Sequence, residues 1–309
     1  MLGRVPGPWP WQGSTVIFPG FELRQVDVGD NVSLRVRIAT VGGTATAGSP
    51  VVLLHGHPRT HTTWHRVAPM LHAAGHTVVC PDLRGYGLSS APAPEPDHTT
   101  YCDRTMAADI VSLMERLGHG RFAVVGHDRG SYVAYRTALD HPERVTRLAV
   151  LDSVPIVEAL EHADARFAEL WWHWFFYASE RAERVIVADP LEWYRPDRSV
   201  MGEESYQDLI RAITRPETVR AMLEDYRAGL HVDRANDEAD RLAGRRITCP
   251  TLVAWSLRDD METLYGDPAR IWSGWCTRPI RTARIGSGHH MAEEAPEQLA
   301  EVLAGFLAE

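Results

Sequence analysis

Cysteine is scarce in this sequence, which limits what can hold its fold together. Only four cysteines occur, Cys80, Cys102, Cys249 and Cys276. They show neither C-x-x-C spacing nor the density of a disulfide-stapled secreted domain. We therefore expect reduced thiols in a cytoplasmic protein.

The sequence also lacks an excess of basic residues. Its formal net charge is -9 and its isoelectric point is near 5.9. Nucleic acids and anionic membranes bind basic surfaces, so neither is an expected partner. No stretch approaches a membrane span, and residues 1–12 lack the basic and apolar segments of a signal peptide. The expected partners are a small-molecule substrate and water, with no cofactor or metal ion, and a homodimer is compatible with the sequence.

Short apolar runs alternate with helical patterns along most of the chain. An antiparallel pair of strands is predicted over residues 21–28 and 32–40. The later apolar runs are residues 51–54, 77–80, 122–125, 148–151 and 251–255. Such runs are typical of parallel strands buried on both faces, and helical patterns lie between them, as at 101–117 and 131–139. The sequence therefore predicts an α/β fold with a mostly parallel central sheet flanked by helices.

This alternation stops between residues 155 and 234. The segment is largely helical in pattern and rich in aromatic residues, among them Trp171, Trp172, His173, Trp174, Phe175, Phe176, Tyr177, Trp193, Tyr194 and Tyr226. We predict a helical cap over 155–234, inserted into a core formed by 1–154 and 235–309. Most of these aromatic side chains are expected to pack the interior of the cap.

A carboxylate stands at the centre of the pentad Gly126-His127-Asp128-Arg129-Gly130, directly after a predicted buried strand. The two glycines permit the sharp turn of a nucleophile elbow, which exposes the central side chain at the edge of the sheet. An aspartate there can displace a leaving group from saturated carbon and form an ester, which is hydrolysed in a second step. This chemistry indicates a carbon–halogen or epoxide substrate. The structural alternative is an acid that only caps the following helix.

Taken together, the motifs resemble the α/β-hydrolase superfamily, and more narrowly its haloacetate (fluoroacetate) dehalogenase branch. The motifs shared by many hydrolases are His55-Gly56-His57-Pro58, Pro81-Asp82-Leu83-Arg84-Gly85-Tyr86-Gly87, the elbow and Gly288-His289. Those typical of the branch are Arg129, His173-Trp174 and Glu224-Asp225-Tyr226-Arg227-Ala228. Epoxide hydrolases of the superfamily usually carry tryptophan where Arg129 stands. The resemblance implies an α/β-hydrolase fold with a cap and a catalytic triad.

The resemblance also implies a two-step mechanism. Asp128 would attack the carbon that bears the halogen, and His289 would activate the water that hydrolyses the ester. His290 is the rival base by adjacency, but the family places its base directly after the glycine. The backbone N–H groups of Arg129 and His57 would stabilise the oxyanion of the second step, and no role is implied for the side chain of His57.

The base needs an acid partner, and two aspartates compete for that role. Asp152 ends the predicted strand at 148–151, where the dehalogenase branch keeps its acid. Asp259 follows the predicted strand at 251–255, where most other α/β-hydrolases keep theirs, and Asp260 is a third choice. A strand-end aspartate is also a common loop or helix cap, so one of the two is expected to be structural.

Two further groups of side chains would contact the substrate. His173, Trp174 and Tyr226 match the halide-binding positions of the family, and all three can donate hydrogen bonds to a departing anion. Arg129 would bind the substrate carboxylate. The family usually has a second arginine three residues later, where this chain has Tyr132, which we keep as a candidate substrate contact. Loss of that arginine predicts either weak haloacetate affinity or a substrate that is larger, less charged or not a haloacid.

These residues favour a hydrolase that displaces halide from small 2-haloacids. The alternative is an epoxide hydrolase with the same aspartate and histidine chemistry, in which Tyr226 with Tyr177 or Tyr194 protonates the epoxide oxygen. A third hypothesis, a non-catalytic receptor on a hydrolase scaffold, is disfavoured because nucleophile, base and acid candidates are all present.

Overall fold

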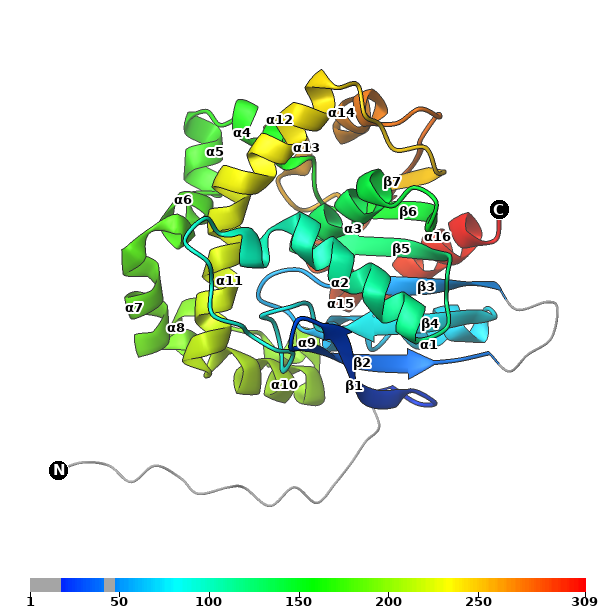
Figure 1. Cartoon of the computed structure of the whole chain (residues 1–309), viewed down its shortest axis with the longest axis horizontal. Helices are drawn as coiled ribbons and strands as arrows, with labels where there is room; N and C mark the ends of the chain where they lie inside the picture. The colour runs from blue at the N-terminus through cyan, green and yellow to red at the C-terminus, as the bar shows by residue number, and fades with distance from the viewer. Residues whose placement is uncertain (1–17, 42–47) are drawn as a thin grey trace, which may run out of the picture.

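The structure, a computed structural model, describes residues 18–41 and 48–309 (Figure 1). Residues 1–12, where the sequence predicts no signal peptide, lie outside the described residues. The described chain forms an eight-stranded sheet covered by helices on both faces. The strands are β1 (Glu22–Gly29), β2 (Val32–Ala39), β3 (Gly48–Leu54), β4 (His76–Pro81), β5 (Phe122–His127), β6 (Val145–Leu151), β7 (Thr251–Ser256) and β8 (Arg281–Ile285).

The sheet is mostly parallel, with its strands in the order β1-β2-β4-β3-β5-β6-β7-β8. The first two strands form the predicted antiparallel pair, and β2 is also antiparallel to β4. From β4 to β8 every neighbouring pair is parallel. The predicted fold class is confirmed, and the carboxyl ends of β3, β5, β6, β7 and β8 therefore meet at one edge of the sheet.

Adjacent residues of the central strands enter two different apolar clusters. On β5, Val124 lies in the cluster formed with helices α2 (Asp103–Arg116) and α3 (Arg129–Asp140), whereas Val125 lies in the cluster formed with α1 (Val67–Ala73) and α16 (Pro296–Leu307). Val52 and Val51 divide in the same way on β3. Because successive side chains of a strand point to opposite faces, a strand covered on both faces is apolar at every position. This is why the strands appear in the sequence as continuous apolar runs.

The helices of the core follow the strands in sequence. They are α1 (Val67–Ala73), α2 (Asp103–Arg116), α3 (Arg129–Asp140), α13 (Met261–Tyr265), α14 (Pro268–Trp275), α15 (Met291–Glu294) and α16 (Pro296–Leu307), with short 3-10 turns η1 (His61–Trp64) and η2 (Thr99–Tyr101). None of the helices in the described residues has the length and apolar character needed to cross a membrane.

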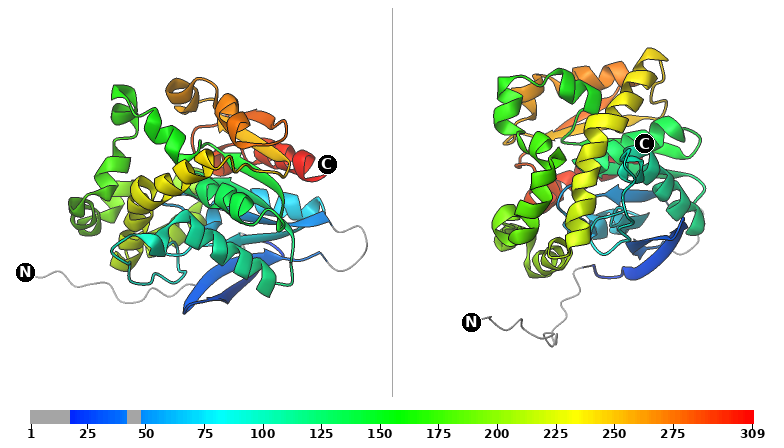
Figure 2. Two further views of the ribbon diagram at one scale, coloured as in Figure 1. Left: turned by 45° about the horizontal axis from the view of Figure 1, so that its top comes forward. Right: turned by 60° about the vertical axis from the view of Figure 1, so that its left-hand side comes forward.

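A second group of helices lies between β6 and β7 in the chain. They are α4 (Ile156–Glu161), α5 (Ala165–Leu170), α6 (His173–Ala178), α7 (Glu180–Ala188), α8 (Pro190–Tyr194), α9 (Arg198–Met201), α10 (Glu203–Ile213), α11 (Pro216–Ala228), the π-helical turn η3 (Gly229–Asp233) and α12 (Arg234–Leu242). Figure 2 shows them gathered on one side of the sheet, with α11 and α12 forming a nearly continuous rod. These helices begin where the alternation of strands and helices stops in the sequence, and α12 extends beyond the predicted boundary at residue 234.

Candidate active site

Asp128 occupies a sharp turn between β5 and α3. Its backbone lies at φ 51 and ψ -122, a conformation rarely adopted by a residue with a side chain. The turn needs glycine at position 126, because a Cβ atom there would lie 2.1 Å from the carbonyl oxygen of Gly130. This is the strained geometry of a nucleophile elbow, and it sets the carboxylate at the carboxyl edge of the sheet.

The carboxylate of Asp128 is held from two sides. Its Oδ1 accepts a hydrogen bond of 2.7 Å from the backbone N–H of His57, and its Oδ2 lies 3.7 Å from Nε2 of His289. Gly56 leaves room for this carboxylate, because a Cβ there would lie 2.2 Å from Oδ1. Burial alone would raise the pKa of Asp128, but the neighbouring His289 outweighs burial and holds that pKa well below its usual range. Asp128 is therefore ionised at neutral pH.

Both acid candidates reach the same nitrogen of His289. Nδ1 of His289 lies 2.9 Å from Oδ2 of Asp152 and 2.9 Å from Oδ2 of Asp259. Asp152 follows β6 and is fully buried, and its carboxylate also accepts hydrogen bonds from the backbone N–H and the hydroxyl of Ser256. The side chain of Asp259 follows β7 and is 25% exposed. Both aspartates are thus within hydrogen-bond distance of the histidine, and the expectation that one of them is structural stays a prediction.

The three carboxylates set the charge of His289. Burial alone would lower the pKa of His289, but Asp128, Asp152 and Asp259 outweigh burial and raise that pKa well above its ordinary value. The resting imidazole therefore tends to be protonated. Conversion of Asp128 to a neutral ester would remove one of these charges and make His289 a better base.

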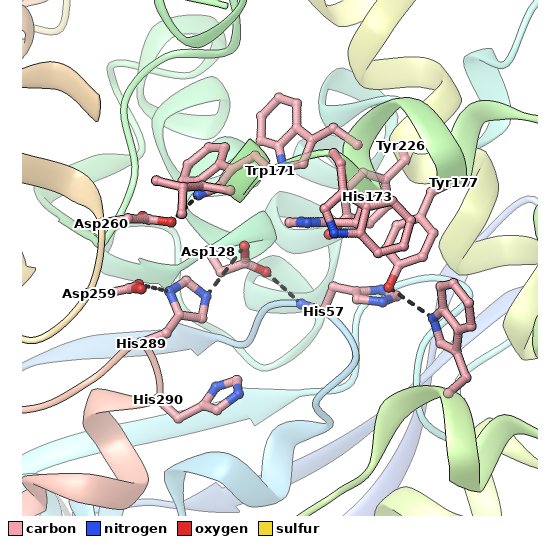
Figure 3. Close-up of a pocket in the computed structure, with 14 residues that line it drawn as sticks. His57, Asp128, Trp171, His173, Tyr177, Tyr226, Asp259, Asp260, His289 and His290 are labelled. Atoms are coloured by element: carbon pink, nitrogen blue, oxygen red, sulfur yellow. Dashed lines mark hydrogen bonds and ion pairs between the residues drawn. The ribbon is translucent and has the colours of Figure 1, made fainter. Parts of the chain in front are cut away.

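A cavity of about 360 Å³ opens in front of Asp128 (Figure 3). Its wall combines catalytic-type side chains from the sheet edge with aromatic side chains from α6, α8, α11 and the turn before α6. The lining residues are His57, Asp128, Leu170, Trp171, Trp172, His173, Trp174, Tyr177, Trp193, Tyr226, Asp259, Asp260, His289 and His290. The candidate site residues from the sequence that do not line this cavity are Arg129, Tyr132, Asp152 and Tyr194.

The three residues expected to bind halide lie together in the wall. The ring centroid of Tyr226 is 6.1 Å from that of His173 and 6.2 Å from that of Trp174. Burial lowers the pKa of His173 to about 4 and raises that of Tyr226 well above its ordinary value, so both side chains are neutral. A neutral imidazole, a phenol and an indole each offer one hydrogen-bond donor to the cavity.

Arg129 does not line the cavity and is 1% exposed. Its Nε donates to both carboxylate oxygens of Asp225 at 3.1 Å, and its Nη2 donates to the backbone carbonyl and to Oδ1 of the same residue. Asp225 also accepts a hydrogen bond of 2.5 Å from the hydroxyl of Tyr86. Only Nη1 of Arg129 has no hydrogen-bond partner among the described residues. The carboxylate contact expected of Arg129 is thus already occupied in large part by Asp225.

Tyr132 packs against this arginine. Its ring centroid lies 4.8 Å from Cζ of Arg129, as does the ring centroid of Tyr226. Both distances are within the range of a cation–π contact. Where the family usually has a second guanidinium, this chain therefore has an aromatic ring that covers the first, and Tyr132 has no direct access to the cavity.

Two tryptophans of the site, Trp171 and Trp193, had no assigned role in the sequence, where aromatic enrichment of residues 171–194 was their only signal. Trp171 donates a hydrogen bond of 2.6 Å to Asp260, the third acid candidate, whereas Asp152 and Asp259 are the acids that contact His289. Trp193 donates one of 3.2 Å to the hydroxyl of Tyr177. Asp225 stood inside a motif quoted for Tyr226, but its partner Arg129 is 96 residues away and could not be identified from the sequence.

One group of side chains near the site has the composition of a metal site. Nitrogen and oxygen atoms of His127, Asp152 and His289 lie within 4.8 Å of one another. These atoms already form hydrogen bonds with one another and with the backbone. His127 Nε2 is 2.7 Å from the carbonyl oxygen of His289, and His289 Nδ1 contacts Asp152. The group is better described as a hydrogen-bonded support of the base.

Comparison with known proteins places this geometry in a family. A model described as the alpha/beta hydrolase fold matches residues 49–296. The chain belongs to this family. It is 38% identical over 303 residues to the fluoroacetate dehalogenase of a Burkholderia species, covering 95% of this chain and 96% of that protein. It is also 31% identical to the soluble epoxide hydrolase of Corynebacterium sp. (strain C12), over 86% of this α/β hydrolase and 92% of that protein.

A solved structure agrees with these sequence relatives. The protein ALR0039 from Nostoc sp PCC 7120 superposes with a TM-score of 0.88 at 37% identity, covering 94% of this α/β hydrolase and 99% of the other chain. The resemblance to the α/β-hydrolase superfamily and to haloacetate dehalogenases is thereby confirmed.

Proposed function

We propose that the protein is a hydrolase that displaces halide from small 2-haloacids through an ester on Asp128. The main support is the Asp128 carboxylate, which is ionised, has one oxygen held by a backbone N–H, and faces an aromatic cavity containing three neutral donors. The 38% identity to a fluoroacetate dehalogenase supports the same class of reaction.

In the first step, Oδ2 of Asp128 attacks the carbon next to the substrate carboxylate. Oδ2 is the better placed oxygen, because Oδ1 is engaged by the backbone N–H of His57. A carbon–oxygen bond forms as the carbon–halogen bond breaks, and the halide leaves with the bonding electron pair. The donors of His173, Trp174 and Tyr226 stabilise the negative charge that develops on the halogen.

In the second step, water attacks the carbonyl carbon of the ester and gives a proton to Nε2 of His289. The gap of 3.7 Å between Nε2 and Oδ2 is too long for a direct hydrogen bond, and a water on the carbonyl side would lie within reach of Nε2. The backbone N–H of His57 then faces the oxyanion, and His289 returns its proton to the departing hydroxyl of the product. The net change is replacement of halide by hydroxyl, with release of one proton.

Recognition of the substrate carboxylate is expected to be weak. The chain contains no lysine, and no arginine lines the cavity in the described part of the chain. Arg129 is paired with Asp225, which offsets its charge, and only its Nη1 has no hydrogen-bond partner in the described part of the chain. We therefore expect the preference for chloroacetate over the neutral chloroacetamide to be small.

Halide release tests the proposal directly. Ion chromatography should detect chloride from chloroacetate and fluoride from fluoroacetate, and Asp128→Asn should abolish both while circular dichroism shows an intact fold. A wild-type protein that releases no halide from any 2-haloacid or haloamide would refute the proposed reaction.

A second candidate is epoxide hydrolysis, supported by a pair of cap tyrosines. The ring centroids of Tyr177 and Tyr226 are 4.8 Å apart, and both residues line the cavity. Burial raises the pKa of Tyr177 to about 12, so both phenols remain protonated and can donate to an epoxide oxygen. Formation of diol from styrene oxide, without halide from any haloacid, would favour this candidate.

A further inference from the structure

The imidazole of His57 is a buried polar group without a partner. Its residue is only 9% exposed, and neither ring nitrogen has a hydrogen-bond partner among the described residues. The motif His55-Gly56-His57-Pro58 places the backbone N–H of His57 against Asp128. It assigns no role to the side chain of His57. Burying a polar group without a hydrogen bond costs free energy, so an unpaired imidazole in a cavity wall indicates a ligand contact.

The ring of His57 lies beside the side chains that are expected to bind the departing halide. His57 lines the cavity, and its ring centroid lies 5.1 Å from that of Tyr226 and 5.1 Å from that of Tyr177. Tyr226 in turn contacts His173 and Trp174. Figure 3 shows the ring of His57 on the opposite side of Asp128 from His289, next to Tyr177. The ring therefore belongs to the donor cluster and not to the base.

The protonation state of the ring suits this position. Burial lowers the pKa of His57 to about 3; the charge of Asp128 opposes this effect and the charge of Arg129 adds to it. The ring is therefore neutral, with one N–H donor and one acceptor nitrogen. It can donate to an anion without forming a fixed ion pair with Asp128.

We propose that the His57 imidazole is an additional leaving-group donor, which hydrogen-bonds the departing halide beside Tyr226 and His173. This role rests on the proposed function, because a halide leaves only if Asp128 displaces it. The donor matters most for fluoride, which is a poor leaving group and the strongest hydrogen-bond acceptor among the halides. His57 would thus extend the range of halogens that the site can expel.

Two variants test the proposal. His57→Phe removes both ring nitrogens but preserves an aromatic ring and the backbone N–H to Asp128, whereas His57→Gln restores a donor and an acceptor. In rapid-quench experiments His57→Phe should slow fluoride release from fluoroacetate roughly 10- to 100-fold, and bromide release from bromoacetate far less. His57→Gln should recover most of the loss, and hydrolysis of the ester should keep its rate in both variants. An equal loss with both halides, or no loss, would overturn the proposal.

A binding measurement separates this proposal from the proposed function. Trp171, Trp172, Trp174 and Trp193 line the cavity, so quenching of tryptophan fluorescence by sodium bromide reports halide binding without turnover. His57→Phe should weaken bromide binding roughly tenfold relative to wild type, and His57→Gln should not. Unchanged bromide affinity in His57→Phe would refute the donor role whether or not the wild type releases halide.

Discussion

Replacement of Asp152 and Asp259 by asparagine, singly and together, tests how two carboxylates share one histidine. Each lies 2.9 Å from Nδ1 of His289, so each can accept the N–H that orients the ring and stabilises the imidazolium. We expect either acid to sustain hydrolysis of the ester when the other is replaced.

The magnitudes follow from the burial of the two acids. A hydrogen bond to a charged group contributes about 1.5 to 3 kcal/mol, which corresponds to roughly a 10- to 150-fold loss in rate. Asp152 is fully buried and Asp259 is 25% exposed, so Asp152→Asn should lie near the upper end and Asp259→Asn near the lower end. The double variant should lose about 10⁴-fold, as when a triad loses its acid.

Single-turnover rapid quench with chloroacetate separates the two chemical steps. The burst of chloride reports attack by Asp128 and should change little in all three variants, whereas release of glycolate should slow in the order given above. If one single variant lost about 10⁴-fold and the other matched wild type, only one acid would serve His289 and the shared arrangement would be wrong.

Three further predictions concern charge. Ester formation removes the charge of Asp128, which helps to raise the pKa of His289. The pKa of His289 seen in the acid limb of ester hydrolysis should therefore be lower than the pKa that NMR gives for His289 in the resting enzyme. Equal pKa values would contradict this. Asp225→Asn should lower KM for chloroacetate relative to chloroacetamide by freeing Arg129, while losing about 3 kcal/mol of unfolding free energy in urea. Burial raises the pKa of Asp233 to about 7, above its unfolded value near 4, so its ionisation destabilises the fold as pH rises between them. Asp233→Asn should accordingly be more stable than wild type at pH 8, by urea denaturation, with a gain that vanishes towards pH 4.

The strands of the central sheet could be predicted from the sequence because their burial requires apolar residues. Strands β3 to β7 are buried on both faces, so each left an apolar run in the sequence. Strand β8 was missed, because Arg281–Ile285 is an edge strand whose side chains are largely exposed and it carries no such run. The elbow was predictable because its two glycines are required by a close backbone contact.

The site was less predictable wherever distant segments meet. The contact of Asp152 and Asp259 with one nitrogen depends on how two strand ends converge at His289, which neither local sequence encodes. The pairing of Arg129 with Asp225 joins the core to α11, so a guanidinium expected to face the substrate was already engaged. The direction in which a charged side chain points depends on its partner. The partner of Arg129 is 96 residues away in the sequence, so the pairing could not be predicted.

The most direct test of the central claim is a single turnover in water labelled with heavy oxygen, with enzyme in excess over chloroacetate. If Asp128 forms the ester, the glycolate of this first turnover contains ordinary oxygen at its new hydroxyl, and the label appears in the peptide that contains Asp128. Mass spectrometry of product and peptide gives both values. Label in the glycolate of the first turnover, with none in Asp128, would show direct attack by water and contradict the account.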